Sequence, residues 1–121
     1  MIHIHRLKTS FLDAKHGLWY VFKHEQNFRV QCGIAVLVMV ATFILSLRRS
    51  EVIVLLLLIL FVLTLELVNS ALEKFLDILK PRFHEQVSLV KDIAAAMVFV
   101  ASLGSAIIGC MVFVPYLIAL F

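Results

Sequence analysis

The sequence predicts an all-α membrane protein with three transmembrane helices and an N-terminal amphipathic surface helix. Of its 121 residues, 63% are hydrophobic and only 16% are charged, a balance too apolar for a soluble domain. Three stretches, Gly33–Leu47, Val52–Leu65 and Ile93–Phe121, contain no charged residue and, with their flanking residues, are long enough to span a bilayer. The length leaves room for a single domain, residues 1–121.

The surface helix is expected over about residues 8–26. Phe11, Leu18 and Phe22 fall on one side of such a helix. Trp19 lies in the middle, and its ring favours the membrane–water interface because it is apolar but carries an N–H group. We therefore expect an amphipathic helix on the cytoplasmic membrane surface; the alternative is an ordinary helix packed against the end of the bundle.

The first two spans are predicted over about residues 29–47 and 52–79. Residues 48–51 form a very short connection, in which Ser50 is expected to cap the second helix. So short a turn makes the two spans antiparallel neighbours. The second helix would be about 42 Å long, so its last turns must emerge from the hydrocarbon core into the cytoplasmic interface.

Two prolines delimit the rest of the chain. Proline disfavours helical geometry in the residue before it, so Lys80-Pro81 is expected to end the second helix. The third span is predicted over about residues 86–119, and Pro115 should kink or end it.

Basic residues are unevenly distributed around these spans. Five precede the first span and four lie around the second connection, whereas only Arg48 and Arg49 lie on the other side. By the positive-inside rule, the N-terminus is cytoplasmic. The net charge of +3 is therefore attributed to topology and to attraction for anionic lipid, not to nucleic-acid binding.

Four polar residues interrupt the second helix: Glu66, Asn69, Glu73 and Asp77. At about 100° per residue they fall within an arc of roughly 80°, and we call them the polar stripe. The stripe runs from bilayer depth to the water interface. Ionisable groups at such depth are costly and usually mark function.

The polar stripe suggests phosphoryl transfer. Clustered carboxylates favour a bound cation, and carboxylates at the end of a span suit Mg²⁺, whose coordination nucleotide phosphates commonly complete. Lys91 can meet those phosphates as a point charge. Glu66, the deepest acid, is placed to act as the base for a lipid hydroxyl. No P-loop motif occurs, so an ATP site here is of another kind.

Two other classes remain open from these residues. In a non-catalytic membrane subunit, the polar residues would only pair helices. A small proton-coupled multidrug transporter would also carry an intramembrane glutamate, but it has no evident use for acids at the interface or for Lys91-Asp92.

Spaced polar residues within apolar helices also match the pattern of a known family. The matching segments are Glu66-Leu67-Val68-Asn69-Ser70-Ala71-Leu72-Glu73, Asp77, Phe83-His84, Lys91-Asp92-Ile93-Ala94-Ala95 and Glu25-Gln26-Asn27-Phe28-Arg29. Over essentially its whole length, the chain resembles the bacterial diacylglycerol kinase and undecaprenol kinase family. The expected activity is ATP-dependent phosphorylation of a membrane lipid alcohol.

The resemblance implies roles in chemistry for four residues. Glu66 would be the general base near the lipid hydroxyl. Asn69 would support the phosphoryl group or orient that base. Glu25 and Glu73 would hold the Mg²⁺ that accompanies ATP.

Nucleotide contacts, assembly and location are implied in the same way. Lys91 would contact the phosphates and Asp92 the nucleotide, Asp77 would line the same site, and Arg6 would reach the nucleotide from the surface helix. Family members are homotrimers that share active sites between subunits and are multi-pass proteins of the bacterial inner membrane.

The acceptor is expected to be undecaprenol, with diacylglycerol as the alternative. Asn27, His84 and the run after Lys91 resemble the undecaprenol kinase branch, because the other branch tends to have a Gly-Ser pair where Ala94-Ala95 stand. The chain departs from both branches at residues 97–99 and 102–105, so the lipid groove is expected to have its own shape.

Overall fold

The computed structural model describes all residues 1–121 and is almost entirely helical, without strands. Its helices are α1 (Ile4–His24), α2 (Gln26–Ile44), α3 (Arg49–Leu79) and α4 (His84–Leu120). The last three are long and apolar enough to cross a membrane. The predicted fold class is confirmed.

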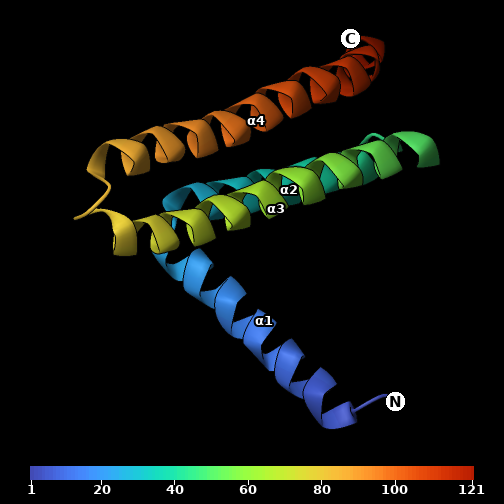
Figure 1. The fold of residues 1–121 in the computed structure, drawn as a ribbon. Coiled ribbons are helices and arrows are strands. Elements are labelled where there is room, and N and C mark those ends of the chain that lie inside the picture. The colour runs from blue at the N-terminus through green and yellow to red at the C-terminus, as the bar shows by residue number, and fades with distance from the viewer.

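Helix α3 is the central element of the bundle. It packs along α4 most extensively and along α2 to a lesser extent, whereas the backbones of α2 and α4 stand apart and the two helices meet only through side chains. Figure 1 shows α2, α3 and α4 running roughly parallel or antiparallel, with α1 leaving the bundle at a wide angle. The inner face of α3, between α2 and α4, is therefore where a site can form.

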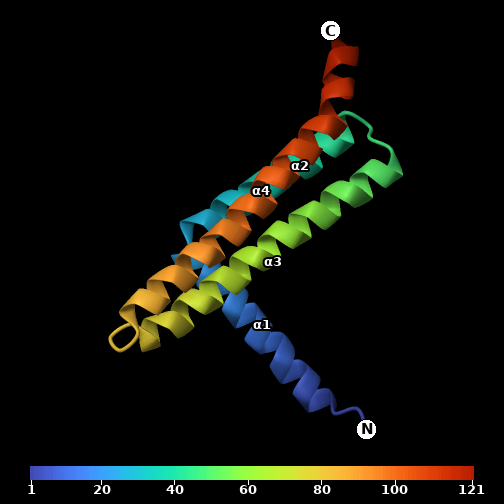
Figure 2. The same cartoon turned by 45° about the horizontal axis from the view of Figure 1, so that its top comes forward.

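The two ends of the bundle differ in what they contain. Figures 1 and 2 show the α1–α2 junction and the α3–α4 turn at one end, and the α2–α3 turn and the C-terminus at the other. The first end carries α1 and most of the basic residues; the second carries Arg48 and Arg49.

A corner at Glu25 separates α1 from α2. Glu25 is extended (φ −108°, ψ 110°), while the residues on both sides are helical. The Arg29 guanidinium donates hydrogen bonds to the carbonyl oxygens of Phe22 and Lys23, at 2.9 and 2.8 Å. These bonds satisfy carbonyls that the end of α1 leaves free, so the corner is held in place. Helix α1 begins earlier than the sequence predicted, at Ile4.

Most of α1 extends away from the bundle (Figures 1 and 2). Helix α1 contacts α2 and α3, yet the apolar side chains of Phe11, Leu18 and Trp19 are exposed. This leaves an apolar face available to a bilayer surface, as the amphipathic-helix interpretation requires.

The α2–α3 turn corrects one prediction. Helix α2 ends at Ile44 and α3 begins at Arg49, so Ser50 lies inside α3 and is not its cap. The Glu51 carboxylate instead reaches back to accept a hydrogen bond of 3.2 Å from the backbone N–H of Arg48. The Tyr116 hydroxyl also donates to Glu51, which fastens the C-terminal part of α4 to the start of α3.

The two prolines act differently. Helix α3 ends at Leu79, directly before Lys80-Pro81, as predicted. Pro115 lies inside α4, which continues to Leu120 and bends near its C-terminal end (Figure 2). At 37 residues α4 is about 56 Å long, so it extends beyond the roughly 30 Å hydrocarbon core.

A single copy of the chain has a small buried core. Only 11 of 121 residues are buried, and many large apolar side chains of α2, α3 and α4 are exposed. These surfaces must therefore be covered by lipid or by other protein chains.

Candidate active site

The polar stripe lies on the inner face of α3 and changes gradually in exposure. Glu66 is only 4% exposed, Asn69 and Glu73 are half-buried, and Asp77 is exposed. Phe75, on the opposite side of the helix, is 59% exposed. The stripe therefore faces the bundle, and it leads from a buried carboxylate to the water interface.

The corner at Glu25 brings a third carboxylate to the deep end of the stripe. Glu25 and Glu73 are the charged groups that act electrostatically on Glu66. None of the three side chains forms an ion pair, although each is half-buried or buried. Like charges held together in this way favour a cation among them.

The donor set fits Mg²⁺ held together with a nucleotide. No three acidic, histidine or cysteine side chains converge closely enough to hold a metal ion by themselves. Mg²⁺ keeps several waters and is usually bound by one or two carboxylates plus substrate phosphates, so it needs no such cage. Two half-buried carboxylates, Glu25 and Glu73, can supply the protein ligands.

The outer end of the stripe carries cations. Lys91, from α4, donates a hydrogen bond of 2.7 Å to Asp77 on α3, which joins the two helices near their connecting turn. Lys74 and Lys80 also lie close enough to act on Asp77. The site thus has carboxylates at its deep end and lysines at its outer end, where a polyphosphate would enter from water.

A contact between α1 and α3 lies beside these lysines. The Lys74 ammonium lies over the Tyr20 ring, 5.2 Å from its centroid, and Tyr20 stacks on His24 at 4.2 Å. Sequence reasoning missed this contact, because it depends on how α1 meets α3 and has no local signal. It anchors the end of α1 next to Glu25.

Two predicted nucleotide-binding residues lie farther out. Asp92 is exposed, follows Lys91 on α4 and makes no hydrogen bond or ion pair. Arg6 is near the free end of α1, about 28 Å along the helix from Glu25, and that part of α1 extends away from the bundle (Figure 1). The structure therefore leaves Asp92 at the exposed edge of the site and Arg6 at a distance from it.

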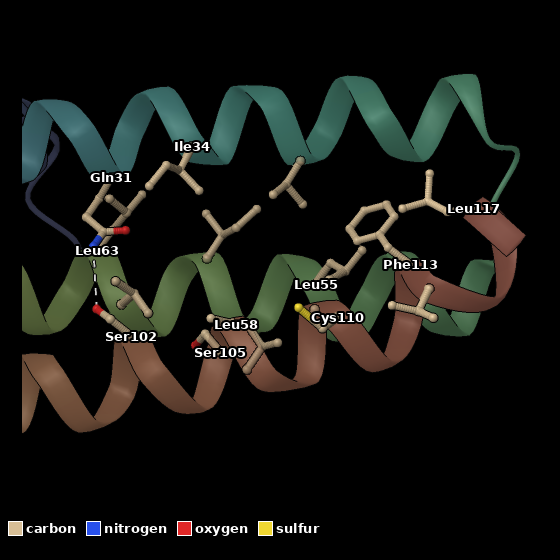
Figure 3. Close-up of a pocket in the computed structure, with 16 residues that line it drawn as sticks. Gln31, Ile34, Leu55, Leu58, Leu63, Ser102, Ser105, Cys110, Phe113 and Leu117 are labelled. Carbon is tan, nitrogen blue, oxygen red and sulfur yellow. Dashed lines mark hydrogen bonds between the residues drawn. The ribbon is translucent and has the colours of Figure 1, made fainter.

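An apolar groove of about 410 Å³ adjoins the deep end of the stripe, between α2 and α4 (Figure 3). At the end nearer the stripe, the Gln31 side chain of α2 donates a hydrogen bond of 3.4 Å to the Ser102 hydroxyl of α4. Ser105 adds a buried hydroxyl group without a partner. The sequence predicts that residues 102–105 shape the lipid groove, and Ser102 and Ser105 line this one, but it does not predict where the groove lies among the helices.

Comparison with known proteins places the chain in a family. The family model described as prokaryotic diacylglycerol kinase matches residues 13–113, most of the chain. The chain belongs to the prokaryotic diacylglycerol kinase family. Every predicted site residue except Arg6 lies within the matched residues.

The relatives of this chain are named for one of two substrates, undecaprenol or diacylglycerol. The chain is 33% identical to the undecaprenol kinase of Bacillus subtilis over 114 residues, which cover 94% of this chain and 93% of the relative. It is 36% identical to a diacylglycerol kinase of Synechocystis over 94% of this chain and 66% of the relative. It is 38% identical to a diacylglycerol kinase of Haemophilus influenzae over 70% of this chain and 72% of the relative.

Membership of this family makes the protein a lipid kinase embedded in a membrane by several spans. The transporter and non-catalytic interpretations of the polar stripe are thereby replaced by an enzymatic one. The buried carboxylate, the neighbouring carboxylates and the lysines at the interface suit a reaction between a lipid hydroxyl and a phosphate donor.

Proposed function

We propose that the protein transfers the γ-phosphoryl group of ATP to the hydroxyl of undecaprenol at the cytoplasmic face of the membrane. The observation that carries this proposal is the position of Glu66, a buried carboxylate at bilayer depth whose stripe leads to the water interface. Ala94-Ala95 and the match to the Bacillus subtilis enzyme along nearly all of both chains favour undecaprenol.

Glu66 acts as the general base. Its carboxylate takes the proton from the lipid hydroxyl while that oxygen attacks the γ-phosphorus, and the bond from this phosphorus to the ADP oxygen breaks. Asn69, three residues later on the same stripe, orients Glu66 or the phosphoryl group. Its amide can both donate and accept hydrogen bonds.

Glu25 and Glu73 are the residues that would hold Mg²⁺. When bound with ATP, the ion neutralises phosphate charge and orients the phosphates. The hydrogen bonds of Arg29 hold the corner between α1 and α2 that carries Glu25. Glu73 comes from the stripe itself, so the two ligands are fixed by different elements.

The lysine-rich outer end binds the nucleotide. Lys91 contacts the phosphates, and Asp77 holds its ammonium in position through the 2.7 Å ion pair. Asp92 contacts the nucleotide from the next position of α4. Arg6 contributes from α1, which requires α1 to come closer to a bound nucleotide, or to a neighbouring subunit's site, than it lies here.

The exposed apolar surfaces and the distribution of basic residues support a proposed assembly and orientation. The proposed state is a homotrimer with active sites shared between subunits, supported by the small buried core and the extensive apolar surface of a single copy. The proposed location is the bacterial inner membrane with the N-terminus in the cytoplasm. The basic residues at the α1 end of the bundle support that orientation.

The test is phosphate transfer from γ-labelled ATP to undecaprenol and to diacylglycerol in parallel, with purified protein, with and without Mg²⁺. The proposal predicts Mg²⁺-dependent product mainly from undecaprenol. Product mainly from diacylglycerol, as the names of two relatives suggest, would keep the chemistry and change the acceptor. No product from either lipid would contradict the proposal.

A further inference from the structure

The groove between α2 and α4 is suited to hydrocarbon. Sixteen residues line it, twelve of them are hydrophobic and none is charged. All of them belong to the three membrane-spanning helices, so the groove lies at the depth of lipid tails. A polar ligand would find few partners there.

The groove leads directly to the predicted base. Leu55, Ile59, Val62 and Glu66 occupy one face of α3, because their spacings of four, three and four residues follow the helical period. The first three line the groove, and Glu66 is the next residue on that face. Leu55 is about 16 Å along the helix from Glu66, so a chain in the groove would extend away from the site toward the far side of the bilayer.

The two ends of the groove are marked by different side chains. Figure 3 shows the Gln31–Ser102 hydrogen bond at the end near Leu63, and Phe113 and Leu117 at the other end. Leu63 precedes Glu66 by three residues of α3. The ring of Phe113 points between the helices. The groove therefore has a polar entrance beside the acids and an apolar far end.

Gly109 forms part of the groove wall on α4. A Cβ atom added at Gly109 would meet no atom within 4 Å, so a side chain introduced there would start in open groove space. Gly104, on the same helix, is equally free of neighbours but does not line the groove. The two glycines are about 140° apart around α4, which makes Gly104 a matched control for Gly109.

We propose that the hydrocarbon chain of the acceptor lipid lies in this groove, and that Gly109 determines which chains fit by leaving the groove open. The proposal rests on the proposed function, because it assumes that the acceptor hydroxyl is at Glu66.

Tethering explains why the acceptor chain occupies the groove in preference to other lipid chains. Lipid tails are as apolar as the groove wall, so no hydrophobic driving force selects among them, and packing decides. The chain of a lipid whose hydroxyl is already at Glu66 is present at a high effective concentration beside the groove entrance.

The first test compares Gly109→Leu with Gly104→Leu, both checked for wild-type assembly size. Undecaprenol and geraniol are the acceptors, because the geraniol tail is too short to reach Gly109. We expect Gly109→Leu to lower kcat/KM for undecaprenol relative to geraniol by about tenfold, a typical effect of losing packing for one or two methylene groups. Gly104→Leu should leave that ratio within about twofold of the wild type. Equal ratios in the two variants would overturn the proposal.

The second test does not depend on catalysis. A polyprenol with a photoreactive diazirine in its tail is cross-linked to the protein in vesicles, and the labelled residues are mapped. Labelling on the groove face of α4, retained in Gly104→Leu and lost in Gly109→Leu, supports the proposal. Labelling elsewhere, or disulfide cross-linking of two chains through Cys110, would overturn it, the latter because a second copy would then cover the groove.

The two proposals fail separately. If the wild-type protein phosphorylates neither undecaprenol nor diacylglycerol, the proposed function fails. If the wild-type protein is active but Gly109→Leu and Gly104→Leu behave alike in both tests, only the groove proposal fails.

Discussion

The inner face of α3 has two regions of opposite chemistry, and each contains side chains that are almost fully buried. Leu55 and Val62, which line the groove, are 3% and 6% exposed, and Glu66 is 4% exposed. A buried leucine stabilises the bundle by packing, whereas a buried carboxylate costs free energy unless a partner compensates it. The acidic half of this face is therefore retained for its chemistry and the apolar half for recognition and packing.

This contrast predicts opposite consequences for mutations in the two halves. Neutralising a carboxylate of the acidic half should lower activity. At Glu66 it should also leave the fold intact or more stable, because an unpaired buried charge disappears. Filling or emptying the apolar half should change acceptor recognition and leave the phosphoryl chemistry in place.

Glu66→Gln is expected to have the largest effect. The amide keeps the shape of the side chain but cannot take a proton, so transfer should fall by about 10²- to 10⁴-fold with helix content and assembly unchanged. Initial rates with labelled ATP measure the effect. Glu51→Gln is the control at the other end of α3: it retains an acceptor for Arg48 and Tyr116, and its rate should stay within about twofold of the wild type. Comparable rates in the wild type, Glu66→Gln and Glu51→Gln would show that Glu66 is not the general base.

Glu73→Gln should raise the Mg²⁺ requirement. Loss of one of two carboxylate ligands weakens the site for a cation that depends on charged oxygen ligands, so half-maximal activity should need about tenfold more Mg²⁺. Titration of activity with Mg²⁺ at saturating ATP gives the value. Glu25→Gln should behave in the same way although it lies on another element. A Mg²⁺ requirement that changes in neither variant would exclude this pair as the metal ligands.

Lys91→Ala and Asp77→Asn should distinguish a residue that binds the ATP phosphates from one that positions it. Removing Lys91 takes a charge from the phosphates and should raise the KM for ATP by about tenfold. Asp77→Asn keeps the lysine but loosens its 2.7 Å ion pair, so the KM should rise less. Steady-state kinetics with varied ATP measures both. A larger effect from Asp77→Asn than from Lys91→Ala would contradict the role assigned to the pair.

The contact between α1 and α3 should have the smallest effect. Tyr20→Leu removes the ring under the Lys74 ammonium, which is exposed to water. Amide hydrogen exchange in the last turns of α1 should become about two- to fivefold faster, while exchange in α3 stays the same. Trp19→Leu is the control on the neighbouring position, since the Trp19 ring stacks with Phe22 of the same helix, whereas the Lys74 ammonium lies over Tyr20. Unchanged exchange in Tyr20→Leu would mean that Arg29 alone holds the corner.

The sequence was sufficient to predict the spans because their evidence is local. Charge-free runs and the Lys80-Pro81 stop are both carried by neighbouring residues. The cap of α3 was predicted at Ser50 and found at Arg48, because a serine in the turn is a good cap only if the helix starts after it. The Glu51 side chain allows an earlier start.

The polar stripe was predictable for the same reason, since helical periodicity alone puts Glu66, Glu73 and Asp77 on one face. What periodicity could not give is which elements meet that face. The approach of Glu25 depends on the corner held by Arg29, and the groove depends on α2 and α4 standing apart on either side of α3. No fixed spacing of residues in the sequence predicts such tertiary features.

The central claim is that the acidic region of α3 performs the chemistry, whereas the apolar region recognises the lipid. The most direct test is to measure kcat and KM for undecaprenol separately in Glu66→Gln and Gly109→Leu, at saturating ATP and Mg²⁺. A residue that acts only in the transition state changes kcat, and one that binds substrate and transition state equally changes KM. The account predicts a lower kcat with a near-normal KM in Glu66→Gln, and a higher KM with a near-normal kcat in Gly109→Leu. Loss of the same kinetic parameter in both variants would contradict it.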